Sequence, residues 1–208
     1  MGKMLVQNKE FKMKKKVFSM WIAFALVSGL VATAFADPSI PEKKQTVLGL
    51  YLTAREAYVK WHTDKANIKI LDVRTPGEYI FVGHAPMAVN IPIKFLAPNV
   101  DAASGKPRMP LNDNFIEEVR KRFQPADTIF VMCRSGGRSA AAVNTLAKAG
   151  YKQVYNIVDG FEGDPLNVPG SYNNGRRIIN GWINAGLPWT YTLDPQLAYS
   201  RWRLLLKN

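Results

Sequence analysis

One stretch near the middle of the chain limits the possible folds more than any other. Residues 128–139 read Thr-Ile-Phe-Val-Met-Cys-Arg-Ser-Gly-Gly-Arg-Ser. The first five are apolar and rich in β-branched side chains, which is typical of an interior strand of a parallel sheet. Gly136 and Gly137 permit a tight turn, and residues 140–150 are good helix formers that end at a glycine. The stretch therefore predicts a buried strand, a tight loop that opens with a cysteine, and a helix.

The loop places Cys133, the only cysteine of the chain, beside groups that favour negative charge. Backbone N–H groups of a turn at a helix N-terminus attract anions and favour a thiolate over a thiol. Arg134 and Arg138 add two positive charges. We therefore expect Cys133 to be a nucleophile in an anion-binding loop, and the alternative is a buried structural cysteine. With one Cys and two His, we expect neither an internal disulfide nor a metal site.

Strand and helix patterns alternate along the chain on both sides of this stretch. The alternation indicates an α/β fold with a central parallel sheet and helices on both faces. Ligands of such folds bind at the carboxyl ends of the strands, where Cys133 lies. We expect residues 96–110 to form an irregular loop that overhangs the site. The other expected strands are 68–73, 88–91 and 153–158, and the other expected helices are 53–62, 78–81, 114–123 and 177–185.

The N-terminal segment, residues 1–36, has the pattern of a secretory signal peptide. Lysines precede an apolar run over 17–31, and Ala34-Phe35-Ala36 provides a small-x-small cleavage sequence. We expect cleavage after Ala36 and a periplasmic location. A retained signal anchor is the alternative, because residues 17–35 approach the length of about 20 residues that spans a bilayer. Either Met1 or Met13 serves as the start.

The remaining boundaries follow from composition. Residues 37–50 contain two prolines and read as a mobile leader, 51–190 as the folded domain, and 191–208 as a C-terminal tail that packs on the domain. The whole chain carries 28 basic and 16 acidic residues. A basic surface draws small anions toward a protein. No basic and aromatic platform of the nucleic-acid-binding kind is present, so we expect no nucleic-acid partner.

Several segments together resemble the rhodanese-like sulfurtransferase family. The sequence Cys-Arg-Ser-Gly-Gly-Arg-Ser at 133–139 is similar to the active-site loop of that family, and residues 71–79 and 83–92 resemble its two entry motifs. Residues 159–163 and 180–189 resemble its closing segment. The resemblance runs in the right order from about Thr53 to Trp189, and it implies the rhodanese-like fold in a single copy, since no internal repeat is present.

The resemblance also implies roles for individual residues. Cys133 would be the catalytic nucleophile and would carry a persulfide. Arg134 would bind the anionic donor or remain an exposed loop charge, and Arg138 would support the loop. His84 would be structural, with a catalytic base as the alternative. The remaining implied members are Ser135, Gly136, Gly137 and Ser139 as substrate-binding residues, and Asp72, Arg74 and Glu78 as structural support.

The implied reaction moves sulfur from thiosulfate or a similar small anionic donor to an external acceptor. The acceptor would be cyanide, a small thiol or a cysteine of a partner protein, because the chain has no second cysteine, and no cofactor is expected. A non-catalytic persulfide carrier that binds a partner in the cell envelope is the second hypothesis. A phosphatase or arsenate-reductase activity is the third, but related enzymes of those kinds have a loop one residue longer than residues 133–138. Contact with a membrane is expected only if the signal segment is retained.

Overall fold

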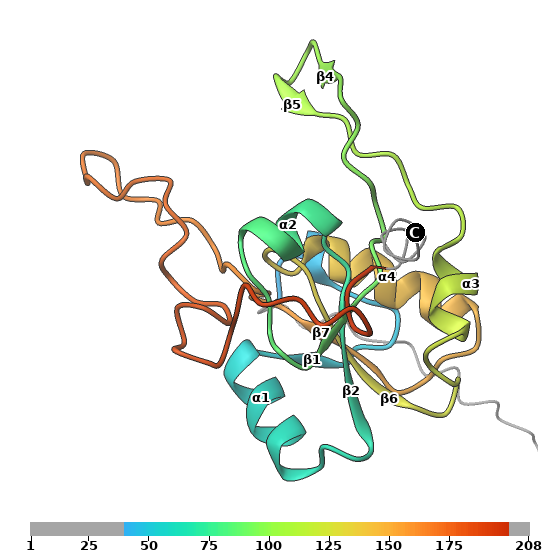
Figure 1. Cartoon of the computed structure of the whole chain (residues 1–208). Helices are drawn as coiled ribbons and strands as arrows, with labels where there is room; N and C mark the ends of the chain where they lie inside the picture. The colour runs from blue at the N-terminus through green and yellow to red at the C-terminus, as the bar shows by residue number, and fades with distance from the viewer. Residues whose placement is uncertain (1–39, 200–208) are drawn as a thin grey trace, which may run out of the picture. The chain divides into compact units, whose positions relative to one another are not determined.

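The computed structural model describes residues 40–199 of the chain (Figure 1). The predicted signal segment at 1–36 lies outside the described residues, as do the first residues of the leader and the last residues of the tail. Within 40–199, no helix has both the length and the apolar character needed to cross a membrane. The helices are η1 (Glu42–Lys44), α1 (Ala54–Thr63), α2 (Pro76–Phe81), α3 (Phe115–Arg120) and α4 (Gly137–Lys148).

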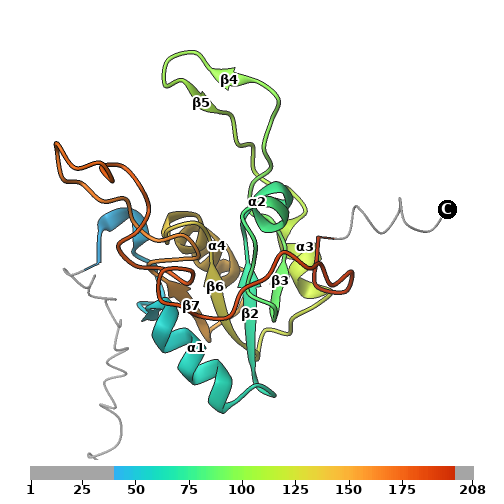
Figure 2. The same ribbon diagram turned by 60° about the vertical axis from the view of Figure 1, so that its left-hand side comes forward.

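A parallel sheet of five strands forms the centre of the domain, in the order β1-β7-β6-β2-β3. A separate antiparallel pair, β4 and β5, forms a hairpin that extends away from the sheet (Figure 2). The predicted parallel α/β architecture is confirmed. The strands are β1 (Tyr51–Leu52), β2 (Ile68–Asp72), β3 (Ala88–Asn90), β4 (Val100–Asp101), β5 (Lys106–Pro107), β6 (Thr128–Met132) and β7 (Val154–Ile157).

Two apolar clusters cover the two faces of the sheet, because side chains alternate along β6. Ile129 and Val131 point to the cluster formed with α3 and α4. Phe130 and Met132 point to the cluster formed with α1 and the buried Trp182. β6 is buried on both faces, which explains why its sequence is a continuous apolar run.

Two helices begin with the same side-chain arrangement, and the sequence predicted the first of them. Thr53 caps α1 and Thr75 caps α2, and in both the glutamate three residues later accepts a hydrogen bond from the backbone N–H of the capping threonine. These capping boxes satisfy backbone N–H groups that the first helical turn leaves unpaired. Glu56 lies on an exposed surface, whereas Glu78 is half-buried beside the Cys133 loop.

The predicted helix over 177–185 is wrong. This segment has an isolated β-bridge at Arg177, followed by bends and turns, and Gly181 has a φ of +95°. A Cβ at Gly181 would lie 2.4 Å from the backbone nitrogen of Gly163, so the segment passes too close to residues 162–163 for a regular helix there. Ile178 and Ile179, which gave the sequence its helical apolar pattern, are 43% and 54% exposed.

The described part of the leader is not free of the domain. Lys44 in η1 is 5% exposed, and its Nζ atom lies 2.8 Å from a carboxylate oxygen of Asp164. The backbone oxygen of Lys44 accepts a hydrogen bond from the side chain of Asn156 in β7. The expectation of a mobile leader is therefore wrong for this part, because these contacts tie it to β7 and to the segment after Phe161.

Candidate active site

The sulfur of Cys133 lies at the carboxyl end of β6, the middle strand of the sheet. The Gly136 N–H donates a hydrogen bond to Sγ at 3.2 Å, and the Ser139 hydroxyl oxygen lies 3.4 Å from Sγ. Ser139 Oγ also lies 3.0 Å from the Gly136 carbonyl oxygen, so its single proton serves one acceptor at a time. Cys133 is only 1% exposed and packs on an apolar cluster, but its sulfur faces hydrogen-bond donors.

Backbone contacts hold the Cys133 loop (residues 133–138) in this shape. Phe161 N–H donates to the Cys133 carbonyl at 2.8 Å, and Glu162 N–H donates to the Arg134 carbonyl at 2.9 Å. Gly136 adopts a φ of +94°, and a Cβ there would lie 2.2 Å from the Val158 oxygen. Only glycine combines this backbone conformation with such a close approach.

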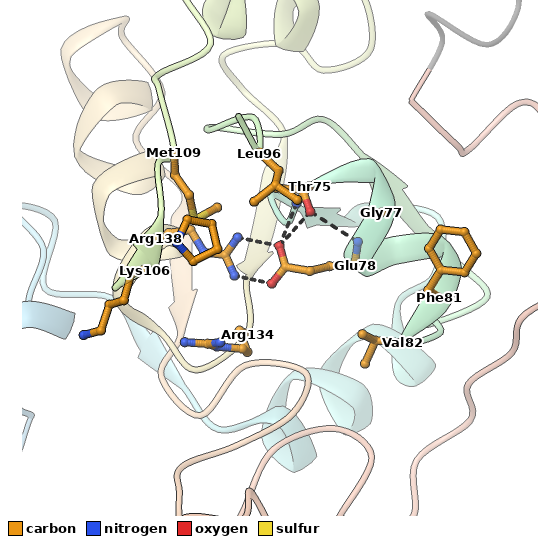
Figure 3. A pocket seen from close by; sticks show the side chains of 11 residues that line it. Thr75, Gly77, Glu78, Phe81, Val82, Leu96, Lys106, Met109, Arg134 and Arg138 are labelled. Carbon is orange, nitrogen blue, oxygen red and sulfur yellow. Dashed lines mark hydrogen bonds and ion pairs between the residues drawn. The ribbon is translucent and has the colours of Figure 1, made fainter. Parts of the chain in front are cut away.

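Glu78 and Arg138 form a two-pronged ion pair at the edge of the loop (Figure 3). Both nitrogen-to-oxygen distances are 2.6 Å. Burial opposes ionisation of Glu78, but hydrogen bonds and the charge of Arg138 outweigh it and lower the pKa of Glu78 to about 2. Burial likewise opposes the charge of Arg138, whose pKa Glu78 and the nearby Cys133 raise. Arg138 therefore stays protonated within the electrostatic reach of the sulfur.

Asp72 and Arg74 form a second ion pair, which is fully buried below the site. Arg74 donates to Asp72 through Nε and Nη2, with the shortest distance at 2.6 Å, and Nη2 also donates to the Gly83 carbonyl. The guanidinium lies 4.0 Å from the ring centre of Phe161. Phe161 in turn donates its N–H to Cys133, so this pair supports the segment that holds the loop.

His84 packs inside the domain. Its ring stacks on Tyr79 at 3.8 Å between centroids, and Nδ1 lies 3.0 Å from the Tyr79 carbonyl oxygen. Burial lowers the pKa of His84, which favours the neutral ring. Neither hydrogen bond of the Cys133 sulfur comes from His84.

Some of the residues predicted for substrate binding contact the Cys133 sulfur, and others do not. Arg134 is exposed at the rim of the loop, and Gly137 is the first residue of α4. Neither Ser135 nor Gly137 donates a hydrogen bond to the Cys133 sulfur within the described residues. The donors to the sulfur are therefore Gly136 and Ser139, and Arg134 contributes a surface charge.

Arg177 is a site residue that the sequence did not reveal. Partial burial and the charge of Arg134 lower the pKa of Arg177, whereas Glu162 and Cys133 act in the opposite direction. Glu162 is partly buried, and this burial raises the pKa of its carboxyl group. Arg177 was assigned to a helix that does not form. It lies in the irregular stretch after β7, where its guanidinium donates to the Gly163 carbonyl. The basic pair Arg176-Arg177 in a glycine-rich segment was the only signal for it.

Residues 96–110 lie beside the Cys133 loop as expected, but they are not wholly irregular, because β4 and β5 pair within them. Leu96, Lys106, Pro107 and Met109 line a cavity together with Arg134 and Arg138 of the Cys133 loop (Figure 3). Among residues 40–199, no three His, Cys, Asp or Glu side chains are grouped as metal ligands.

Comparisons with known proteins agree with this geometry. The model of the rhodanese-like domain matches residues 56–164. An Arabidopsis thaliana protein named thiosulfate sulfurtransferase 16, chloroplastic, is 42% identical over 96 residues, which are 46% of this chain and 72% of that protein. The uncharacterized protein RP600 of Rickettsia prowazekii is 34% identical over 60% of this chain and 85% of its own length.

The fold is also similar to that of a protein whose structure has been solved. The crystal structure of Rv0390 from M. tuberculosis superposes with a TM-score of 0.53 at 28% sequence identity, over 68% of this chain and 96% of that one. The family match covers more than half of this chain, and it includes Cys133, the whole Cys133 loop and the ion pairs Asp72–Arg74 and Glu78–Arg138. The chain therefore belongs to the rhodanese-like domain family.

Proposed function

We propose that this protein is a sulfurtransferase that carries sulfane sulfur on Cys133. The observation that carries the proposal is the Gly136 N–H aimed at the Cys133 sulfur at 3.2 Å, at the end of the middle strand of the sheet. The hydroxyl of Ser139 is a second donor to the same sulfur, and the charges of Arg138 and Arg177 interact with Cys133. Such an environment stabilises an anionic sulfur before and after it gains a second sulfur atom.

In the first half of the reaction, the Cys133 thiolate attacks the outer sulfur of thiosulfate. A sulfur–sulfur bond forms at Cys133, and the bond between the two sulfur atoms of thiosulfate breaks. Sulfite leaves with the electron pair of that bond, so no external oxidant or reductant is needed. Because Cys133 is 1% exposed, the donor must place its outer sulfur inside the Cys133 loop.

In the second half, a nucleophilic acceptor attacks the terminal sulfur of the persulfide. The Cys133 thiolate leaves with the electron pair, and the acceptor departs as thiocyanate or as a new persulfide. The backbone N–H of Gly136 is placed to stabilise the thiolate that reforms. The chain has one cysteine, so an external acceptor must take the sulfur.

Turnover of thiosulfate and cyanide tests the proposal. We expect thiocyanate formation with double-displacement kinetics, and no activity in Cys133→Ser. Saturable binding of a partner without turnover would favour the carrier hypothesis. Hydrolysis of p-nitrophenyl phosphate that depends on Cys133, with no thiocyanate formed, would overturn the proposal in favour of a phosphatase.

We also propose that the protein is exported to the periplasm and cleaved after Ala36. The lysines before the apolar run and the Ala34-Phe35-Ala36 sequence support this. N-terminal sequencing of the protein recovered from cells is expected to begin at Asp37. A first residue before Val17 would contradict cleavage and leave the signal anchor.

A further inference from the structure

The part of the leader that the structure describes packs against the back of the Cys133 loop. A Cβ at Gly136 would lie 3.0 Å from Cδ of Lys44, and a Cβ at Gly137 would lie 3.6 Å from the backbone oxygen of Lys43. Gly136 is also the residue whose N–H donates to the sulfur of Cys133. The η1 segment therefore lies directly behind the turn that holds the sulfur.

The side-chain amide of Asn156 joins η1 to this turn. Asn156 lies in β7 and is fully buried. Its Nδ2 atom donates to the Lys44 carbonyl oxygen at 2.8 Å and to the Gly136 carbonyl oxygen at 3.2 Å. The Ser139 hydroxyl at 3.0 Å and the Ala140 N–H at 3.1 Å also reach the Gly136 carbonyl, but both belong to α4. Asn156 therefore links Gly136 to the sheet and to the leader.

A second set of contacts ties the leader to the other side of the Cys133 loop. The Nζ atom of Lys44 lies 2.9 Å and 2.8 Å from the two carboxylate oxygens of Asp164. Gly163 precedes Asp164 and donates its N–H to the Arg134 carbonyl at 3.2 Å. Lys44 thus packs on Gly136 through its aliphatic stem and supports Arg134 of the same loop through the residues that its ammonium holds.

Glycine needs such outside support to hold its N–H in one direction. Gly136 has a φ of +94°, and glycine has more backbone freedom than any other residue. Rotation about its backbone bonds would turn the N–H away from the Cys133 sulfur. The hydrogen bond from Asn156 and the packing of Lys44 oppose that rotation. An N–H whose direction is fixed in advance stabilises an anion without further reorganisation.

We propose that Asn156 and Lys44 are positioning residues of the sulfur-transfer reaction, which hold the Gly136 N–H against the Cys133 sulfur. The inference rests on the proposed function of Cys133. Lys44 lies outside residues 56–164, the part of the chain that matches the rhodanese-like domain. The leader therefore contributes to the reaction and is more than a spacer that follows the signal segment.

Asn156→Ser removes both hydrogen bonds of the amide. We expect the rate of sulfite release from thiosulfate to fall by about fivefold to tenfold. We also expect alkylation of Cys133 by iodoacetamide to reach half its maximal rate at a pH about 0.5–1 higher, because the thiolate loses a fixed donor. Arg138 and Arg177, whose charges interact with Cys133, are unaltered by the substitution. A midpoint that stays at the wild-type pH would overturn the inference.

Asn90→Ser is the matched control. Asn90 is a buried asparagine of β3, and its Nδ2 also donates to two backbone carbonyl oxygens, those of Asp72 and Arg74, at 2.9 Å and 3.0 Å. We expect Asn90→Ser and Asn156→Ser to lose similar unfolding free energies in urea, but Asn90→Ser to keep the wild-type alkylation profile and a rate within about twofold of the wild type. Equal shifts in both variants would mean that lost stability causes the effect, which contradicts the inference.

Lys44→Met tests the leader and leaves the sheet unaltered. It removes the ion pair with Asp164 that holds η1 in place. We expect sulfite release to slow by about threefold in the single variant, and by less than about twofold when Lys44→Met is added to Asn156→Ser, since both act on Gly136. A wild-type rate in Lys44→Met, or effects that multiply in the double variant, would overturn the assignment to the leader.

The two measurements separate this inference from the proposed function. Alkylation of Cys133 needs no sulfur donor, whereas sulfite release does. A protein that releases no sulfite, but whose alkylation profile still shifts in Asn156→Ser and not in Asn90→Ser, would overturn the proposed function and support the positioning of the Cys133 sulfur. A protein that releases sulfite at the wild-type rate in both Asn156→Ser and Lys44→Met would overturn the positioning and leave the proposed function intact.

Discussion

The sulfur of Cys133 has two close hydrogen-bond donors. One belongs to the Cys133 loop and the other to α4, the helix that follows it. Gly136 supplies a backbone N–H and Ser139 a hydroxyl. His84, the side chain that a base-assisted mechanism would need, stacks on Tyr79 instead. The hydrogen-bond partners of the sulfur are therefore a backbone N–H and a hydroxyl, and no imidazole is among them.

Ser139→Ala tests the side-chain donor. We expect the rate of sulfur transfer from thiosulfate to Cys133 to fall by about tenfold, because a hydrogen bond to an anionic sulfur contributes about 1.5 kcal/mol. Rapid-mixing measurement of sulfite release gives this rate. Ser135→Ala removes a hydroxyl that makes no bond to the sulfur and is expected to have the smaller effect. A larger loss in Ser135→Ala would contradict the assignment.

Glu78→Gln tests the ion pair through its pH dependence. The pKa of Glu78 is about 2 in the folded protein and 4.5 as an ordinary glutamate. Ionised Glu78 therefore stabilises the fold fully above about pH 4.5, and this contribution disappears as the pH falls toward 2. At pH 7 we expect Glu78→Gln to lose on the order of 2–3 kcal/mol of unfolding free energy, measured in urea.

Glu56→Gln is the control for that prediction, because Glu56 occupies the same position in the capping box of α1. It is exposed and has no arginine partner among the three ion pairs of the described residues. We expect a loss of about 0.5–1 kcal/mol at pH 7. Equal losses for the two variants would show that the cap, and not Arg138, accounts for the effect of Glu78.

Among the elements, the turn between β6 and α4 determines whether the site can form. Its sequence predicted a strand, a tight loop and a helix, and the structure has all three at Thr128–Met132 and Gly137–Lys148. Local chemistry specifies these elements: a β-branched apolar run, a glycine pair and helix formers. The irregular segment 164–186 lacks such local signals, and long-range contacts determine its path. The prediction therefore failed there and missed Arg177.

Gly136→Ala tests the close approach inside this turn. Gly136 and Gly150 have almost the same φ, +94° and +97°, but only Gly136 meets backbone within 4 Å. We expect Gly150→Ala to cost about 1–2 kcal/mol from the left-handed backbone alone. Gly136→Ala is expected to cost clearly more and to abolish sulfur transfer. Equal unfolding midpoints in urea for the two variants would contradict the close contact with Val158.

The η1 segment gives a further prediction at this scale. Lys44→Met removes a nearly buried ammonium that pairs with Asp164, and we expect a loss of about 1–3 kcal/mol in unfolding free energy. Lys43→Met alters the exposed neighbour in the same segment and is expected to change stability by less than about 0.5 kcal/mol. Urea unfolding of both variants measures the difference, and equal values would contradict the role of Lys44 in anchoring the segment.

At the scale of the whole molecule, two segments outside the five-stranded sheet contribute residues beside the Cys133 loop. One is the β4–β5 hairpin, which lies on the α2 side and supplies Lys106. The other is the stretch after β7, which supplies Glu162 and Arg177. The parallel sheet and the position of Cys133 at the end of a buried strand were predictable, because they follow from the strand pattern and from the family resemblance. The strand order was not predicted, and the short edge strand β1 was missed. The cavity beside the Cys133 loop was not predictable, since its walls are far apart in the sequence.

The positive net charge of the chain agrees with the proposal of an anionic sulfur donor. Residues 37–208 retain 22 basic and 15 acidic residues, so the basic balance persists without the predicted signal segment. Arg138 and Arg177 carry part of that charge and interact electrostatically with Cys133. The small anionic donor that we propose would therefore be attracted first by the whole molecule and then by the rim of the loop.

Intact-mass measurement after incubation with thiosulfate tests the central claim most directly. The account predicts that the protein gains one sulfur atom, that cyanide removes it, and that Cys133→Ser gains none. A wild-type protein that keeps its unmodified mass while its Cys133 still reacts with an alkylating reagent would contradict the account.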